Sequence, residues 1–142
     1  VSDYLAKYGN IDAVWMDAGG TAVTILEAFK DNGVDYPKVM VGEDQQDYLQ
    51  YVKDNNITAI APVFSTFQWR TAVLAAVMFL QGETVQHHWY LPQPEITQAN
   101  IDQYINPAMP PLHYAMCGCE DMTNYPDAWA TPDINKYKDV ID

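Results

Sequence analysis

The sequence predicts an α/β domain built on a parallel β-sheet, and two features of its pattern support this. Short apolar runs alternate with segments of helical periodicity along residues 11–80. Their spacing fits successive strand–helix–strand units, in which helices cover the sheet. We therefore expect a three-layer lobe over residues 1–105, with helices on both faces of the sheet. Residues 106–142, where Pro and Tyr are frequent, are expected to form an irregular tail that packs on this lobe.

Buried strands are predicted at three short apolar runs, residues 11–16, 38–41 and 57–63. Each run is mostly apolar and is bounded by glycine or by polar turn residues, which is typical of a buried strand. A further short strand is predicted at residues 88–91.

Helices are predicted before, between and after these strands. Residues 2–8 have the pattern of a helix end, and the segment after the first strand keeps helical spacing until Asn32 and Gly33 stop it. Residues 45–54 and 100–105 are predicted as two further helices. The most regular helical pattern follows the third strand and ends at Gly82. We expect its apolar face to be buried on the sheet; its members are Trp69, Ala72, Val73, Ala76, Val77 and Leu80.

Composition and charge exclude several classes of function. The 142 residues contain 49% hydrophobic side chains, which is enough for a folded core. The net charge of −12 argues against nucleic acid and anionic lipid as partners, because no basic stripe is present to neutralise phosphates. The longest apolar stretch, residues 71–80, is too short to span a bilayer.

Cysteine and histidine give no clear metal site. Cys117 and Cys119 are separated by one glycine, which is too short for a zinc knuckle. They form a local disulfide, a bridge between chains or two free thiols. His87 and His88 are adjacent on a predicted strand and point to opposite faces, so they do not chelate one ion together, and His113 stands alone. The sequence predicts no metal and no cofactor.

The carboxyl ends of the predicted strands are the expected place for a ligand, as in other open α/β sheets. Asp17 and Asp44 follow the first and second strands, so both should project into one crevice. A carboxylate can accept hydrogen bonds from two adjacent sugar hydroxyls, and an aromatic ring can stack on the apolar face of a sugar. Trp15 and Phe64 lie at the same predicted edge. We therefore assign ligand contact to Trp15, Asp17, Asp44 and Phe64, and no catalytic residue.

Each of these residues also has a purely structural interpretation. Asp17 fits the N-cap of the helix that follows it, and Asp44 fits a turn or a cap. Trp15 and Phe64 are each consistent with the core, as is Trp69 on its helical stripe.

The segment from Asp17 to Thr21 is also similar to the Asp-x-Asp-Gly-Thr loop of haloacid-dehalogenase-type phosphatases. In that loop the first aspartate attacks phosphorus and the second is the general acid. Gly19 stands here where the second carboxylate is needed. A phosphatase-like enzyme that uses Asp17 therefore remains an alternative with an incomplete motif.

Three stretches, taken in order, resemble the C-terminal lobe of the ribose- and galactose-binding periplasmic proteins, relatives of the lac-repressor effector domain. The first runs from Ile11-Asp12-Ala13-Val14-Trp15 to Leu26-Glu27-Ala28-Phe29, like the family's strand, turn and Ala-rich helix. The second is Val39-Met40-Val41-Gly42-Glu43-Asp44. The third joins residues 72–80 and Gly82-Glu83 to Ile96-Thr97-Gln98-Ala99-Asn100-Ile101-Asp102. The resemblance covers roughly residues 11–105, and it depends on the order and spacing of the motifs.

The resemblance implies a non-catalytic receptor that captures a sugar or polyol for an ABC transporter permease. It places Asp44 where the family has an aspartate that binds sugar hydroxyls, and it places the family's ligand asparagine at Ala18 or Asp17. The family's glutamine near the hinge corresponds to Val63 or Phe64. It further implies an N-terminal lobe that closes on the ligand and a periplasmic or other extracytoplasmic location, secreted or lipid-anchored.

Two further interpretations are consistent with the same sequence features. The lobe is also consistent with the effector domain of a lac-type transcriptional regulator, or with an interaction domain that binds no ligand. If the chain is part of a two-lobed protein, its strand ends stay open to water, and we then expect the isolated chain to form a homodimer.

Overall fold

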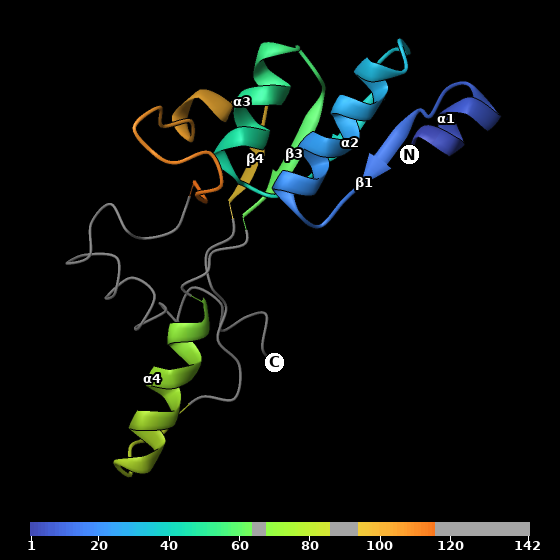
Figure 1. Ribbon diagram of the computed structural model, residues 1–142. Coiled ribbons are helices and arrows are strands. Elements are labelled where there is room, and N and C mark those ends of the chain that lie inside the picture. The colour runs from blue at the N-terminus through green and yellow to red at the C-terminus, as the bar shows by residue number, and fades with distance from the viewer. Residues whose placement is uncertain (64–67, 86–93, 116–142) are drawn as a thin grey trace. The chain divides into compact units, whose positions relative to one another are not determined.

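The computed structural model describes residues 1–63, 68–85 and 94–115. The chain divides into two compact units, the first made of Val1–Phe64 and Pro94–Met116 and the second of Ser65–Gln93 and Cys117–Asp142. The α/β class is confirmed, since helices and strands alternate from the first residue to β4 (Figure 1).

The first unit contains the sheet. Its helices are α1 (Ser2–Tyr8), α2 (Gly19–Asp31) and α3 (Gln46–Asp54), and its strands are β1 (Ala13–Trp15), β2 (Val39–Val41), β3 (Ala59–Pro62) and β4 (Glu95–Thr97), followed by a 3-10 helix (Ile101–Gln103). The strand order is β1-β2-β3-β4, with parallel pairing from β1 to β3 and antiparallel pairing of β3 with β4.

The predicted strands and helices of this unit are present, each within a few residues of its expected bounds. The predicted strand at residues 88–91 lies outside the described residues. β4 was not predicted, because it is only three residues long and follows Pro94 directly. Its antiparallel direction makes the sheet mixed, with one strand reversed.

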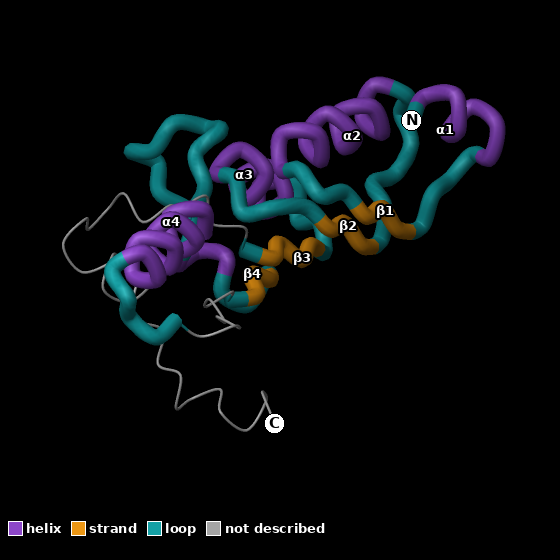
Figure 2. Tube along the Cα trace, turned by 90° about the horizontal axis from the view of Figure 1, so that it is seen from below, coloured by secondary structure: helices purple, strands orange, loops and turns teal. Residues whose placement is uncertain are grey.

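The helices α2 and α3 pack beside each other on one face of the sheet (Figure 2). Both connections move along the sheet in the same direction, from β1 to β2 and from β2 to β3. Because such crossovers are right-handed, consecutive steps in one direction place both helices on the same face. Among the described residues of this unit, no helix covers the opposite face.

The core lies between this helix pair and the sheet. Ala22 and Leu26 of α2 and Tyr48 of α3 are fully buried and form one apolar cluster with Met40 of β2. The hydroxyl of Tyr48 donates a hydrogen bond to the carbonyl of Met40 at 3.1 Å, so this buried polar group is satisfied. A Cβ at Gly42 would lie 2.7 Å from the Tyr48 ring, so only glycine fits where β2 passes the ring.

The opposite face of the sheet is apolar and open. Trp15 is 75% exposed, and Val41 and Ile60 are half-buried. The strand register places these three side chains in one row, because Trp15 pairs with Val41 and Val41 pairs with Ile60. We call this row the open sheet face.

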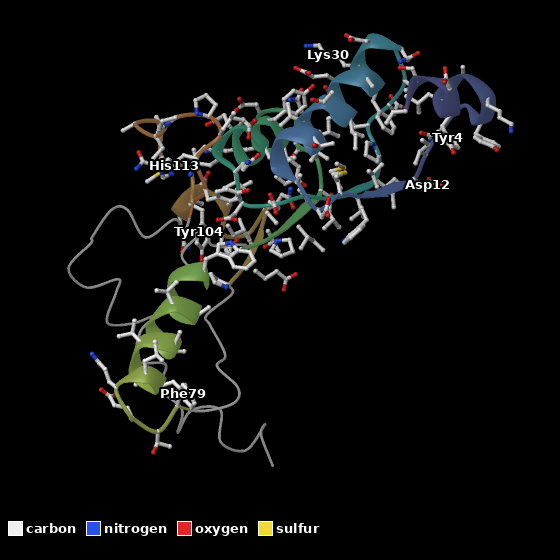
Figure 3. The ribbon with its side chains drawn as sticks, turned by 60° about the horizontal axis from the view of Figure 1, so that its bottom comes forward. Tyr4, Asp12, Lys30, Phe79, Tyr104 and His113 are labelled. Atoms are coloured by element: carbon white, nitrogen blue, oxygen red, sulfur yellow. The ribbon has the colours of Figure 1, made fainter. Side chains whose placement is uncertain are left out.

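The helix α4 (Gln68–Leu80) belongs to the second unit. Its bounds match the predicted helix, but the expectation that its apolar face is buried is not met. Val73 is 63% exposed and Leu80 is 83% exposed, and Trp69, which was assigned to the core, is 68% exposed. Phe79 projects from the same helix and is 72% exposed (Figure 3). The periodicity identified the helix correctly, but it does not identify the surface, if any, that the apolar side contacts.

In the described part of the chain, no helix is both long enough and apolar enough to cross a membrane.

Candidate functional site

The candidate site is the edge of the sheet where β1 and β2 end. These strands are parallel neighbours, so the turn after Trp15 and the turn after Val41 lie next to each other. The backbone N–H of Met16 donates to the carbonyl of Val41 at 3.1 Å and extends the pairing into the turns. The two predicted aspartates follow these strands.

The two turns are joined by side chains that the sequence reasoning did not select. A carboxylate oxygen of Glu43 accepts a hydrogen bond from the Gly19 N–H at 3.4 Å, and the amide oxygen of Gln45 accepts one from the Gly20 N–H at 2.5 Å. These donors belong to the first turn of α2, where the helix itself offers no partner. The turn after β2 therefore caps the helix that follows β1.

Asp17 is exposed, and it is not the N-cap of α2. The N-cap is Ala18, and no side chain of its own caps the helix there. Asp17 is close enough to Glu43 for its charge to raise the pKa of that carboxyl. The cap interpretation of Asp17 is therefore wrong, and its carboxylate faces the same edge as Glu43.

Asp44 lies at the same edge, but its side chain is fully buried. Its charge, like that of Asp17, raises the pKa of the Glu43 carboxyl. The structure thus brings three carboxylates, from two adjacent turns, into electrostatic contact. Asp44 is the innermost of them.

Of the other two predicted residues, Trp15 and Phe64, the structure describes only Trp15. Trp15 is the last residue of β1, and its ring lies on the open sheet face, away from α2 and α3. Phe64 lies outside the described residues.

A segment far away in the sequence lies against this edge. Tyr114 forms a β-bridge with Gln45, and the backbone N–H of Ala115 donates to the carbonyl of Asp44 at 2.8 Å. The Tyr114 hydroxyl donates to a carboxylate oxygen of Glu43 at 3.2 Å. The neighbouring His113 is half-buried, and its carbonyl accepts the N–H of Gln46 at 2.9 Å.

Burial controls the protonation of this edge. It raises the pKa of the Glu43 carboxyl above its usual 4.5; the bonds from Gly19 and Tyr114 oppose this, and the charges of Asp44 and Asp17 add to it. Burial also raises the pKa of the Tyr114 hydroxyl, with the negative charge of Glu43 as the next cause. The edge is therefore rich in acceptors, with a tyrosine hydroxyl among them.

Replacement of Glu43 by glutamine is expected to flatten the pH dependence of stability. Because the folded-state pKa is raised, the folded chain binds protons more tightly than the unfolded one, and stability is lost as pH rises through that pKa. Glu43→Gln removes this loss, so at pH 7 it should unfold at equal or slightly higher denaturant than the wild type. The gain is only about a few tenths of a kcal/mol, because the carboxylate is partly exposed and solvent screens it.

Urea unfolding at pH 4 and at pH 7 measures this effect. A variant that is less stable than the wild type at pH 7, but equal to it at pH 4, would show that the ionised carboxylate stabilises the fold.

The geometry around Gly19 disfavours the phosphatase-like alternative, because this position has little space for the second carboxylate. A Cβ at Gly19 would lie 2.7 Å from the Cβ of Gln45 and 2.8 Å from its amide oxygen. A carboxylate at this position, which that chemistry requires, would have to displace Gln45. No group of three or more metal-binding side chains occurs among the residues that the structure describes.

The residues missed by sequence reasoning differ in how they could have been found. Glu43 and Gln45 flank Asp44, and the same strand-end rule selects them. Tyr114 carries no local signal, because only the return of the chain to this edge places it there.

Comparison with known proteins identifies the fold. The chain is similar to the crystal structure of an ABC transporter solute binding protein from Thermobispora bispora DSM 43833, with a TM-score of 0.64 and 23% sequence identity. The match covers 80% of this chain and 34% of that one, so the chain spans about a third of its length. No family model matches the sequence, and neither does any curated protein. The chain has the fold of part of a solute-binding protein.

Proposed function

We propose that this chain is one lobe of an extracytoplasmic solute-binding protein of an ABC importer, and that it captures a sugar or similar polyol without changing it chemically. The observation that supports this most is the gathering of Asp17, Glu43 and Asp44 at the carboxyl edge of a sheet with that fold. Carboxylates at such an edge are suited to accept hydrogen bonds from the hydroxyl groups of a polyol.

In this proposal the predicted residues contact different parts of the ligand. Asp17 and Asp44 accept hydroxyl donors, and Trp15 and Phe64 offer rings to the apolar face of the sugar. Glu43 is a third acceptor in this proposal, because the charges of both aspartates act on its carboxyl and raise its pKa. A polyol with adjacent hydroxyls can bridge two of these carboxylates.

A second lobe, N-terminal to this one, completes the proposed site. One edge of one sheet covers a ligand from one side only, and half-enclosure leaves much of the ligand in water. The similar solute-binding protein is about three times the length covered by the match. Closure of two lobes on the ligand creates the form that an ABC transporter permease recognises.

Titration calorimetry with D-ribose, D-galactose, D-xylose and myo-inositol tests the proposed function. We expect saturable binding of at least one of them to the two-lobed protein and weaker binding to this chain alone. Absence of binding to all of them would reject a sugar or polyol ligand. Hydrolysis of p-nitrophenyl phosphate in the presence of Mg²⁺ would instead support the phosphatase-like alternative.

The isolated chain is expected to form a homodimer through the open sheet face. Trp15, Val41 and Ile60 form an apolar row that no described helix of this unit covers, and such surfaces are usually buried against a partner. Light scattering over a dilution series should give twice the 16.1 kDa mass of one chain. The variant Ile60→Lys should give the single-chain mass, because a charge in the row opposes burial. A wild-type mass near 16.1 kDa at all concentrations would contradict the dimer.

A further inference from the structure

A hollow lies between α3 and the chain segment 105–111. Its volume is about 360 Å³, at the lower end of the range for small-molecule sites. We call it the α3 pocket. It is lined by Gln46, Asp47, Gln50, Tyr51, Asp54, Ile105, Asn106, Pro107, Met109 and Pro111.

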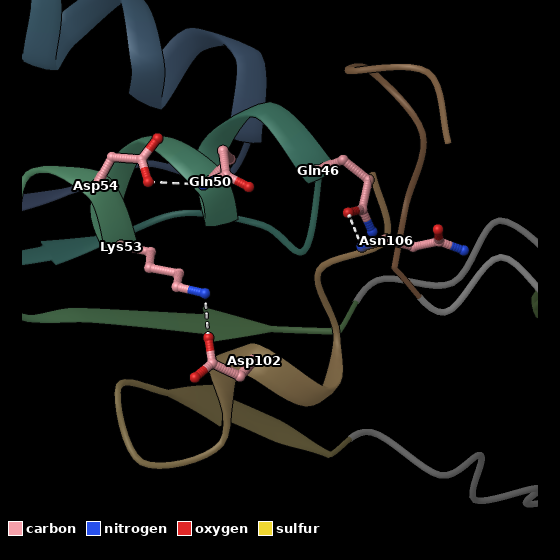
Figure 4. Close-up of polar contacts among 6 residues, drawn as sticks. All are labelled: Gln46, Gln50, Lys53, Asp54, Asp102 and Asn106. Carbon is pink, nitrogen blue, oxygen red and sulfur yellow. Dashed lines mark hydrogen bonds and ion pairs between the residues drawn. The ribbon is translucent and has the colours of Figure 1, made fainter. Parts of the chain in front are cut away.

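The segment that forms the outer wall is fixed to α3 at both ends. At one end the side chain of Gln46 donates to the carbonyl of Tyr104 at 2.9 Å. It also accepts from the Asn106 N–H at 2.8 Å (Figure 4). At the other end the Asp47 N–H donates to the carbonyl of Pro111 at 2.8 Å. The pocket is therefore bounded by hydrogen-bonded walls, which is what a preformed site requires.

Near the far end of α3, a second interaction holds the chain that leads into this segment. Lys53 forms an ion pair with Asp102 of the 3-10 helix at 2.5 Å, with both side chains on the side of α3 that faces the returning chain (Figure 4). Lys53 is thus paired with Asp102, and it is not one of the residues that line the pocket.

The lining combines apolar walls with negative charge. Tyr51, Ile105 and Met109 supply apolar surface, and Asp47 and Asp54 supply two carboxylates. No Lys, Arg or His is among the described residues that line the pocket. A neutral apolar ligand would contact the apolar side chains but would leave the negative charges of the two carboxylates uncompensated.

The two carboxylates are held in place by their neighbours. The Gln50 side chain donates to one oxygen of Asp54 at 2.7 Å (Figure 4), and the Tyr48 N–H donates to one oxygen of Asp47 at 2.7 Å. Burial raises the pKa of the Asp47 carboxyl, which means that its negative charge is poorly solvated. A cation beside it would offset that cost.

We propose that the α3 pocket binds a small organic cation, in which an ammonium group is carried by a compact aromatic or apolar body. The ammonium group lies against Asp47 or Asp54, and the body lies against Tyr51 and the Pro and Met side chains of the outer wall. A ring such as that of Tyr51 also attracts a cation placed over its face. This site is separate from the strand-end edge and does not rest on the proposed function.

The test compares phenethylammonium with 2-phenylethanol, its uncharged counterpart of similar size. In ¹⁵N-labelled protein we expect phenethylammonium to shift the amide signals of α3 and of residues 105–111 in a saturable way. The alcohol should bind at least about fivefold more weakly, since it lacks the charge that the carboxylates recognise. Raising NaCl from about 20 to about 300 mM should weaken the cation several-fold and leave the alcohol unchanged.

Two variants locate the charge. Asp47→Asn and Asp54→Asn should each weaken phenethylammonium by about three- to fivefold, as expected for a partly exposed ion pair. Asp3→Asn, on exposed α1, removes the same charge away from the pocket and should change nothing. Equal binding of the alcohol, shifts spread over the whole acidic surface, or no shifts in the wild type would each overturn the proposal, and none of these results depends on a variant that folds.

Discussion

Truncation of Leu26 to alanine is expected to lower the free energy of unfolding by about 2–5 kcal/mol, the range for cavity-forming substitutions of buried leucine. Leu26 is fully buried on α2, at the centre of the contact between the helix pair and the sheet. The neighbours that surround it come from α3 and the strands, so the cavity cannot collapse without movement of several elements. Urea unfolding followed by circular dichroism measures the loss.

Leu112→Ala is the matched control, because Leu112 belongs to the same unit and is 66% exposed. It should change stability by less than about 0.5 kcal/mol, as surface substitutions do. Similar losses for both variants would show that the core is not where the structure places it.

Replacement of Asp44 by alanine should reduce polyol binding by about a hundredfold or more in the two-lobed protein. A carboxylate that accepts two hydroxyl donors contributes two charge-assisted hydrogen bonds, each with a net contribution of about 1.5–3 kcal/mol. Calorimetric titration measures the loss, and undiminished affinity would remove Asp44 from the site.

Asp44 is buried and makes interactions of its own, so its truncation can also disturb the fold. Asp44→Asn, which keeps the shape, should lose affinity while its unfolding stays cooperative. Glu27→Ala, on the exposed surface of α2, should leave binding unchanged.

The elements of the first unit could be predicted because local patterns determine them. The apolar runs around Val14 and Met40 have no competing interpretation, and Gly33, with φ of +64°, ends α2 where the sequence places the stop. The exposure of the apolar side of α4 could not be predicted, because an apolar stripe indicates only which side of a helix is suited to burial. Whether another surface covers Val73 and Leu80 depends on tertiary contacts, which the local pattern does not contain.

The candidate site could be predicted in outline only. The strand-end rule placed Asp17 and Asp44 correctly at one edge, since parallel strands end together. It did not reveal that Asp44 is buried or that Tyr114 contacts Glu43. The Tyr114 contact depends on the return of the chain after residue 105, a long-range contact for which no residue type is diagnostic.

Chemical-shift mapping with a bound polyol tests the central claim most directly. In the two-lobed protein, titration with D-ribose, D-galactose, D-xylose or myo-inositol should shift the amide signals of residues 16–20 and 42–45 saturably, because these turns form the proposed edge. The signals of α1, which lies on the far side of α2 from α3, should stay in place. Saturable shifts that avoid both turns, or no shifts with any of the four compounds, would contradict the account.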